Sequence, residues 1–313
     1  MNLVMALTLK IIILMIIGYV AKITGIIDEV CKDKMSTLLV NLFLPVSMIA
    51  SSQQSFKLAN LRGCVSVAII ASVYYILAFS IGGMIGRACG MDKDKRSIFI
   101  LLIAFANTGF VGMPVLKEII GDTGTLYGAV YNSVFDILYF SYGISIIDSE
   151  KDDKSRNRLN RILNKKIIGN PMIWIAIITT VLYVVPYRLP LVVTESLNLI
   201  GNCMMPISML IIGAEIAGMD IKKVLADKES YGVSFIRMIA IPSITLLINR
   251  LLNVEYTVLA TVTILAAMPS GSLNVIMGQK YRNNPKFAAG VVMQNTLIMI
   301  ITLPLFIYLL QKK

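Results

Sequence analysis

The sequence contains no histidine, which excludes histidine-based catalytic triads, histidine metal ligands and histidine proton relays. Its four cysteines are far apart and no CxxC pair occurs, which argues against both a zinc site and a disulfide framework. Charged residues make up only 15% of the 313 residues, whereas a soluble domain carries about 25%. Too little polar surface is therefore available to cover a soluble globule of this length.

Apolar residues dominate the chain instead. They make up 57% of it, and the mean hydropathy is +0.77, as expected for a protein that crosses a membrane many times. The HExxH, GxSxG and Walker A motifs are missing, so we expect neither enzymatic activity nor direct use of ATP. We also expect no cofactor and no resident metal ion.

Ten apolar segments have the length and composition of membrane-crossing helices. They are residues 3–21, 35–52, 64–86, 97–118, 124–147, 169–186, 191–215, 232–250, 256–279 and 287–310. Each gap between them carries turn-forming or charged residues, as in residues 92–96. The predicted fold class is an all-α membrane protein with ten transmembrane helices.

Lysine and arginine predict how these helices are oriented. The loops after spans 1, 3, 5, 7 and 9 hold 20 of the 29 basic residues, and the opposite side holds 7. Because basic loops face the cytoplasm, both termini should lie outside the cell membrane and the central loop inside. The net charge of +11 is then a consequence of topology, and no nucleic-acid partner is expected.

An internal repeat divides the chain. Residues 41–49 read N-x-x-x-P-V-S-M-I and residues 202–210 read N-x-x-x-P-I-S-M-L, an offset of 161. Residues 131–133 and 294–296 form a weaker parallel between spans 5 and 10. An odd number of spans per copy forces the second copy to cross in the opposite sense, which is a plan of secondary transporters. We predict a first repeat at 1–147, a cytoplasmic linker at 148–168 and an inverted second repeat at 169–313.

The repeated motif places Asn41 and Pro45 in span 2, and Asn202 and Pro206 in span 7. One interpretation is a structural kink, in which each asparagine bonds a carbonyl that the proline leaves free. The other interpretation is that these residues contact the substrate. The sequence leaves both open.

Spans 4 and 9 are each interrupted in the middle by glycine, proline, asparagine and hydroxyl residues. Interrupted segments at matched positions of two repeats indicate a transporter's binding site, and a pair of structural kinks is the alternative. The candidate substrate-binding residues in these spans are Asn107, Thr108, Gly109, Gly112, Pro114, Pro269, Ser270, Gly271, Ser272 and Asn274. If the breaks cross, two half-helix N-termini meet near the middle of the membrane and favour an anion, such as a carboxylate.

These interruptions also carry a family resemblance. Residues 106–117 (ANTGFVGMPVLK) resemble the fourth span of the auxin efflux carrier family, which includes plant PIN proteins and bacterial malate and malonate permeases. Residues 266–271 (AAMPSG) resemble its ninth span, and residues 169–171 (GNP) resemble the start of its sixth. The resemblance implies a fold like that of bile-acid sodium symporters and sodium/proton antiporters. It also implies a scaffold of spans 1, 2, 6 and 7, a moving unit of spans 3–5 and 8–10, elevator-type transport, and a homodimer through the scaffold.

Ionisable residues inside spans are costly and are treated as functional candidates. Asp136 in span 5 and Lys10 in span 1 are the candidates for ion coupling, and a salt bridge between them is left open. A static hydrogen bond is the alternative for Asp136. Arg237 is expected to extend to the lipid headgroups, and Glu215 is expected at the membrane interface.

The leading functional hypothesis is a secondary transporter that moves small organic anions by alternating access, with the bilayer as its other partner. The alternative within transport is a sodium- or proton-coupled symporter or exchanger of the bile-acid symporter type. A channel or a sensor is the third hypothesis, and saturable flux would distinguish a carrier from a channel.

Overall fold

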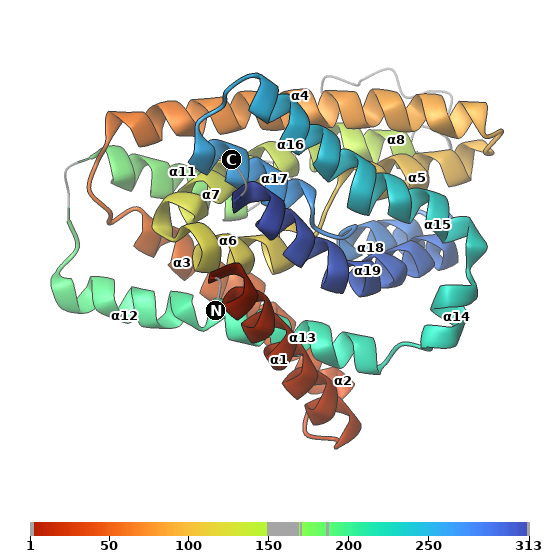
Figure 1. Cartoon of the computed structure of the whole chain (residues 1–313), viewed down its shortest axis with the longest axis horizontal. Coiled ribbons are helices and arrows are strands. Elements are labelled where there is room, and N and C mark those ends of the chain that lie inside the picture. Colours follow the sequence, from red (N-terminus) through yellow and green to blue (C-terminus); the bar gives the residue numbers. More distant parts are fainter. Residues whose placement is uncertain (1–2, 149–168, 170, 186–187, 312–313) are drawn as a thin grey trace.

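The computed structural model describes residues 3–148, 169, 171–185 and 188–311, and within these ranges the chain is helical (Figure 1). The one β-type pairing in them is an isolated antiparallel bridge between Ala106 and Ser270. The predicted all-α class is therefore confirmed. The predicted cytoplasmic linker falls on 148–168 and lies almost entirely outside the described residues.

The helices of the first half coincide with the first five predicted spans. They are α1 (Leu3–Ile23), α2 (Glu29–Leu38), η1 (Leu39–Phe43), α3 (Leu44–Ser51), α4 (Leu58–Ala88), α5 (Lys93–Ala104), η2 (Thr108–Gly112), α6 (Met113–Ile120), α7 (Asp122–Leu138), η3 (Tyr139–Gly143) and α8 (Ile144–Asp148).

The helices of the second half overlap the last five predicted spans in the same way, except for α14, which lies between predicted spans 7 and 8. They are α11 (Pro171–Val184), α12 (Leu191–Asn202), α13 (Met204–Ala217), α14 (Ile221–Ala226), α15 (Lys228–Phe235), η4 (Ile236–Ala240), α16 (Ile241–Leu251), α17 (Tyr256–Ala266), α18 (Ser272–Lys280) and α19 (Pro285–Gln311).

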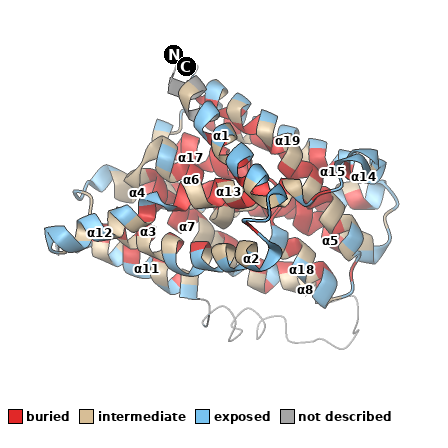
Figure 2. Ribbon diagram, turned by 90° about the horizontal axis from the view of Figure 1, so that it is seen from below, coloured by how far each residue is buried: buried red, intermediate tan, exposed pale blue. Residues whose placement is uncertain are grey.

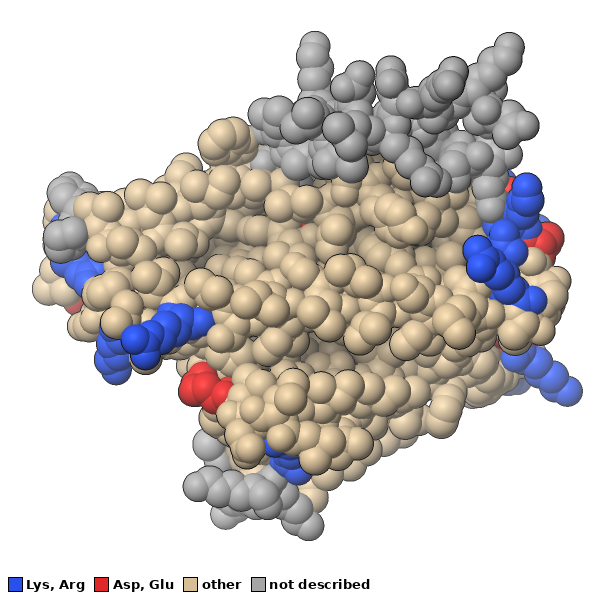
Figure 3. All heavy atoms as spheres, turned by 90° about the horizontal axis from the view of Figure 1, so that it is seen from above, with Lys and Arg blue, Asp and Glu red and all other residues tan. Residues whose placement is uncertain are grey.

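Six uninterrupted helical runs among the described residues are long and apolar enough to cross a membrane. They are Glu29–Ser51, Leu58–Ala88, Asp122–Ile147, Leu191–Ala217, Lys228–Leu251 and Pro285–Gln311. On the face in Figure 3, lysine and arginine gather toward the two ends of the long axis, and the broad surface between them carries almost no charge. Such a surface matches the hydrocarbon layer of a membrane.

The described residues include four single-turn π-helices, and three of them end two residues before a proline. The turns are η1 before Pro45, η2 before Pro114 and η4 before Pro242. Proline lacks an amide proton and clashes with the carbonyl four residues earlier, so a widened turn relieves the conflict. The helix of predicted span 2 therefore contains a π turn just before Pro45.

The helices of predicted spans 1, 2, 6 and 7 contact one another. Helix α1 packs along α13, α13 also contacts α2, and α11 and α12 both pack on α3. Gly18 and Gly213 allow the first of these contacts, because a Cβ on Gly213 would lie 1.9 Å from the carbonyl oxygen of Met15. Small residues permit such close backbone packing between membrane helices.

The remaining helices build the interior around the two interrupted spans. Helix α17 packs against α4, α6 and α7, while α18 packs against α5 and α19. Figure 2 shows buried residues concentrated along α6, α7 and α17. The breaks in spans 4 and 9 therefore lie inside the protein and not on its lipid-facing surface.

Candidate functional site at the crossing of two broken helices

The two interrupted spans cross at their breaks. Helix α5 ends at Ala104 and α17 ends at Ala266, and the extended residues that follow them pair in the antiparallel bridge. The amide of Asn107 donates to the carbonyl of Pro269 at 2.7 Å, and the amide of Gly271 donates to the carbonyl of Phe105 at 3.0 Å. The backbone groups freed by the breaks thus satisfy each other, which buried backbone requires.

Side chains also donate hydrogen bonds to carbonyls at the end of α5. The Ser270 hydroxyl donates to the carbonyl of Leu102 at 2.6 Å, and Asn274 Nδ2 donates to that of Phe105 at 3.0 Å. Ser270 and Asn274 are 1% and 0% exposed. Both residues therefore hold the crossing together, a role that sequence reasoning had not separated from substrate binding.

Two helix N-termini point into the crossing. The segment η2–α6 begins at Thr108 with Asn107 as its N-cap, and α18 begins at Ser272 with Gly271 as its N-cap. The first amides of each helix have no acceptor within the helix, and they form its positive dipole end. The side chain of Asn107 is only half-buried, and Ser272 is exposed. An anion is the ligand that this arrangement favours.

A matched asparagine supports each break. The Thr108 hydroxyl donates to Asn132 Oδ1 of α7 at 2.5 Å, and Asn295 Nδ2 of α19 donates to the Ser270 hydroxyl at 2.8 Å. The weak sequence parallel between residues 131–133 and 294–296 thus has a structural meaning. Each asparagine fixes a hydroxyl residue at the break of its own half.

The repeated motif of spans 2 and 7 lies next to the break in span 4. The Ser208 hydroxyl in α13 donates to the carbonyl of Phe110 at 2.7 Å, and η1 packs against η2. Pro45 and Pro206 are half-buried, whereas Asn41 and Asn202 are exposed, with Asn202 at the end of α12. The motif therefore comes close to the crossing, and its Ser208 makes a hydrogen bond to the π turn η2 of span 4.

Glycine and proline shape the crossing itself. A Cβ on Gly112 would lie 2.6 Å from Cδ2 of Leu265, so glycine lets η2 pack on α17 without displacing that leucine side chain. Gly109 is half-buried beside Leu44. Pro114 is buried as the second residue of α6, just after the π turn η2, which accommodates a proline inside the helical segment.

The charged residues inside predicted spans have different partners from those considered in the sequence. Lys10 Nζ lies 3.3 Å from Glu118 Oε1 of α6, which gives Lys10 an ion-pair partner other than Asp136. Asp136 is half-buried in α7 and engaged in an interaction of its own. Glu215 is half-buried in the last turn of α13.

The expectation for Arg237 is wrong, because this residue is 0% exposed and does not extend to the lipid headgroups.

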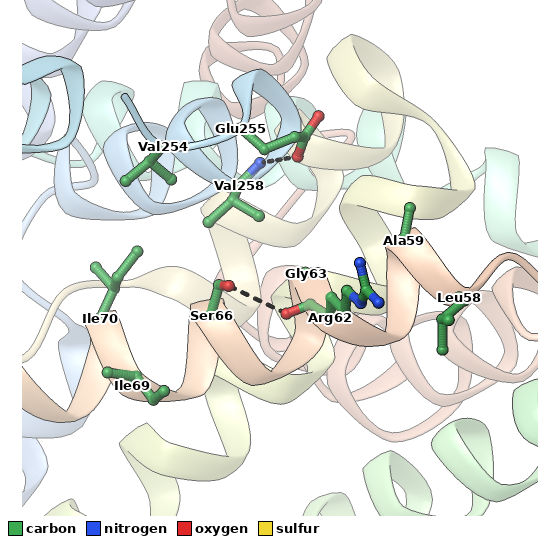
Figure 4. Close-up of a pocket in the computed structure, with 10 residues that line it drawn as sticks. All are labelled: Leu58, Ala59, Arg62, Gly63, Ser66, Ile69, Ile70, Val254, Glu255 and Val258. Carbon is green, nitrogen blue, oxygen red and sulfur yellow. Dashed lines mark hydrogen bonds between the residues drawn. The ribbon is translucent and has the colours of Figure 1, made fainter. Parts of the chain in front are cut away.

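A cavity of about 500 Å³ lies elsewhere, between the first turns of α4 and α17 (Figure 4). Its walls are mainly apolar, with Arg62 and Glu255 as the charged members. The Glu255 carboxylate accepts from the amides of Thr257 and Val258 and therefore caps α17. The crossing lies at the opposite end of α17, so this cavity is a separate feature.

Comparison with known proteins agrees with a role in transport. A family model described as membrane transport protein matches residues 3–307. An uncharacterized transporter of Methanothermobacter thermautotrophicus is 22% identical over 304 residues, which cover 95% of each chain.

Two further relatives match over a similar length. The uncharacterized transporter MJ1031 of Methanocaldococcus jannaschii is 23% identical over 320 residues and 98% of each chain. The uncharacterized transporter YfdV of Escherichia coli is 20% identical over 308 residues, with 96% of this chain and 95% of YfdV covered. All three relatives are named as transporters, and none of the names states a substrate.

Proposed function

Because the chain belongs to the membrane transport protein family, which contains the auxin efflux carriers, we propose that it is a secondary transporter of small organic anions such as carboxylates. The observation that carries the proposal is the pair of half-helix N-termini, at Thr108 and Ser272, on either side of the Ala106–Ser270 bridge. Unpaired amides and helix dipoles attract negative charge, and amide and hydroxyl side chains beside them supply neutral hydrogen bonds.

The architecture that we propose is ten spans in two inverted repeats of five. The hydrogen bonds of the crossing support it, because residues 105 and 107 exchange bonds with 269 and 271, an offset of 164 that is close to the 161 of the sequence motif. An inverted repeat lets one fold open to either side of the membrane in turn.

The motion that we propose is of the elevator type. The contacts among α1, α2–α3, α11 and α12–α13 support a scaffold, and the contacts among α4–α8 and α15–α19 support a moving unit that carries the crossing. A homodimer through the scaffold, a location in the cell membrane and outside termini complete the proposal. A sodium- or proton-coupled symporter or exchanger is the second candidate, because Asp136 lies half-buried in α7 of the moving unit.

The test is binding and flux with the purified full chain. Thermal shift against monocarboxylates, dicarboxylates, indole acids and amino acids identifies a ligand, because binding to the folded state raises its stability. Uptake into proteoliposomes should then saturate, which excludes a channel. Pro114→Ala and Pro269→Ala should reduce uptake even in folded protein, because they allow the helices to re-form across the breaks.

Asn107→Ala is the decisive variant. Loss of a hydrogen bond to a charged ligand costs about 1.5–3 kcal/mol, which corresponds to roughly 10- to 150-fold weaker binding. Ala59→Trp is the matched control, because Ala59 lines the separate cavity between α4 and α17 (Figure 4). Wild-type affinity in Asn107→Ala together with lost binding in Ala59→Trp would move the site from the crossing to that cavity.

A further inference from the structure

Arg237 is a buried positive charge in the middle of an apolar helical run. It lies in η4, between α15 and α16, in the run Lys228–Leu251 that is long enough to span a membrane. The residue is 0% exposed, and η4 packs against α5 and α19. Arginine keeps its charge in a protein, so burying it at this depth costs free energy unless the charge is paired. A charged residue buried in a membrane span is therefore a candidate for a functional role.

Only part of the guanidinium group is used in the described structure. Arg237 Nη1 donates to the Tyr74 hydroxyl at 2.7 Å, whereas Nε and Nη2 are buried with no hydrogen-bond partner among the described residues. Nε and Nη2 form one edge of the guanidinium, and that edge matches the two oxygens of a carboxylate. The free donors are therefore the pair that binds a carboxylate in bidentate fashion.

Tyr74 connects this charge to the crossing. Its hydroxyl donates to the carbonyl of Ala104 at 3.2 Å, and Ala104 is the last residue of α5 before the break. Two successive hydrogen bonds of 2.7 and 3.2 Å thus bring Arg237 within about 6 Å of the backbone of the crossing. One tyrosine side chain therefore separates the Arg237 charge from the residue at which the break in span 4 begins.

A role in stabilising α5 explains the hydrogen bond of only one of the three guanidinium nitrogens of Arg237. A cation near the C-terminus of a helix is favourable, and Nη1 serves that purpose through Tyr74. The same purpose does not explain why the Nε–Nη2 edge has no partner. A buried donor without a partner costs free energy, so an anion that pairs with it in another state of the protein would recover that cost.

We infer that Arg237 binds the carboxylate of the transported anion through its Nε–Nη2 edge. This inference rests on the proposed function and adds a residue that selects for negative charge. Because Arg237 is sealed in this conformation, the edge becomes available when the helices around it separate to admit the anion. The bound carboxylate then neutralises the arginine, which lowers the cost of carrying both charges through the membrane.

The test uses the purified full chain and six probes: propionate, succinate, indole-3-acetate and their amides. Isothermal titration gives the Kd of each probe for wild type, Arg237→Gln and Arg237→Lys. The carboxylates should bind wild type, and Arg237→Gln should weaken them roughly 10- to 150-fold. Arg237→Lys keeps the charge but loses the planar pair of N–H donors, so an intermediate loss of carboxylate affinity is expected. Arg250→Gln is the control, because Arg250 is exposed at the end of the same run and bonds the carbonyl of Leu309.

The outcomes separate this inference from the proposed function. Carboxylate affinity unchanged in Arg237→Gln and reduced in Asn107→Ala would overturn the inference and leave the anion site at the crossing. If no carboxylate binds wild type, or if amides bind as tightly as carboxylates, both fail. If Arg237→Gln does not fold, Arg237→Lys decides, and wild-type affinity in it contradicts bidentate binding. Tyr74→Phe should lower the melting temperature with less than a fivefold change in Kd; a loss equal to that of Arg237→Gln would make Arg237 purely structural.

Discussion

The amide of Asn107 donates to the carbonyl of Pro269, and this bond joins the break of one half of the chain to the break of the other. Its counterpart joins Gly271 to Phe105. Because each break supplies the acceptor that the other needs, neither can move away without leaving buried backbone groups unpaired. The two half-helix N-termini are therefore held together, and in the alternating access that we propose the whole crossing would move against the helices that surround it.

The two asparagines of the crossing should respond differently to truncation. Asn274 is 0% exposed and its Nδ2 bonds the carbonyl of Phe105, so Asn274→Ala should lower the free energy of unfolding by about 1–3 kcal/mol. Asn107→Ala should change it by less than about 0.5 kcal/mol, because its side chain is only half-buried, and should act on affinity instead. Thermal melting measures the stability of both variants, and ligand titration measures their affinity. Equal losses of stability in the two variants would contradict the prediction.

The bond between Thr108 and Asn132 should be measurable as a coupling energy. In a double-mutant cycle of Thr108→Val and Asn132→Ala, we expect about 0.5–1.5 kcal/mol of interaction, because both groups lie at the break and bond each other at 2.5 Å. Thr108→Val with Ser133→Ala is the control cycle, since the Ser133 hydroxyl bonds Ala129 in its own helix. Additive effects in the first cycle would show that the bond does not support the crossing.

Asp136 gives a prediction about ion coupling. If its carboxylate exchanges a proton during transport, Asp136→Asn should abolish the dependence of uptake on pH and leave equilibrium binding largely intact. Proteoliposome uptake from pH 5 to 8 measures this dependence. A folded, active variant that keeps the wild-type pH profile would assign Asp136 a static role.

The orientation of the chain can be tested with single cysteines in a cysteine-free background. Cysteines at Lys57 and Arg188 should react with a membrane-impermeant maleimide in intact cells, because the basic-residue bias places them outside. A cysteine at Lys154 should react only after permeabilisation. Labelling of Lys154 in intact cells would reverse the proposed topology.

The crossing was predictable from the sequence because it leaves a local signature. Glycine, proline and asparagine in the middle of an apolar run weaken a helix at a definite residue, and the break before Asn107 follows from that chemistry alone. The π turn before Pro45 has the same local origin. What these residues bond was not predictable, since the register between neighbouring helices is set by packing over the whole bundle.

Arg237 shows the limit of such reasoning. An arginine in an apolar run is expected to extend to the lipid headgroups, and only the packing of α5 and α19 against η4, with the bond to Tyr74 of α4, reveals that it is buried. Asn132 and Asn295 were visible as a parallel between the halves, but their partners lie at the breaks of other spans. Tertiary contacts, and not local composition, determine the burial and the hydrogen-bond partners of these residues.

The contact between α1 and α13 was equally hidden, and it gives the last prediction. A Cβ on Gly213 would lie 1.9 Å from the carbonyl oxygen of Met15, and one on Gly18 would lie 2.1 Å from that of Leu210. Because backbone atoms cannot rotate away, Gly213→Ala must push the helices apart and should cost about 1–3 kcal/mol of stability.

Gly232→Ala in α15 is the control. Nothing lies within 4 Å of a Cβ at this position, and alanine favours the helix, so the melting temperature of the variant should stay equal or rise. Melting curves of the two purified variants test the contact, and equal stability would mean that α1 and α13 lie farther apart than this packing requires.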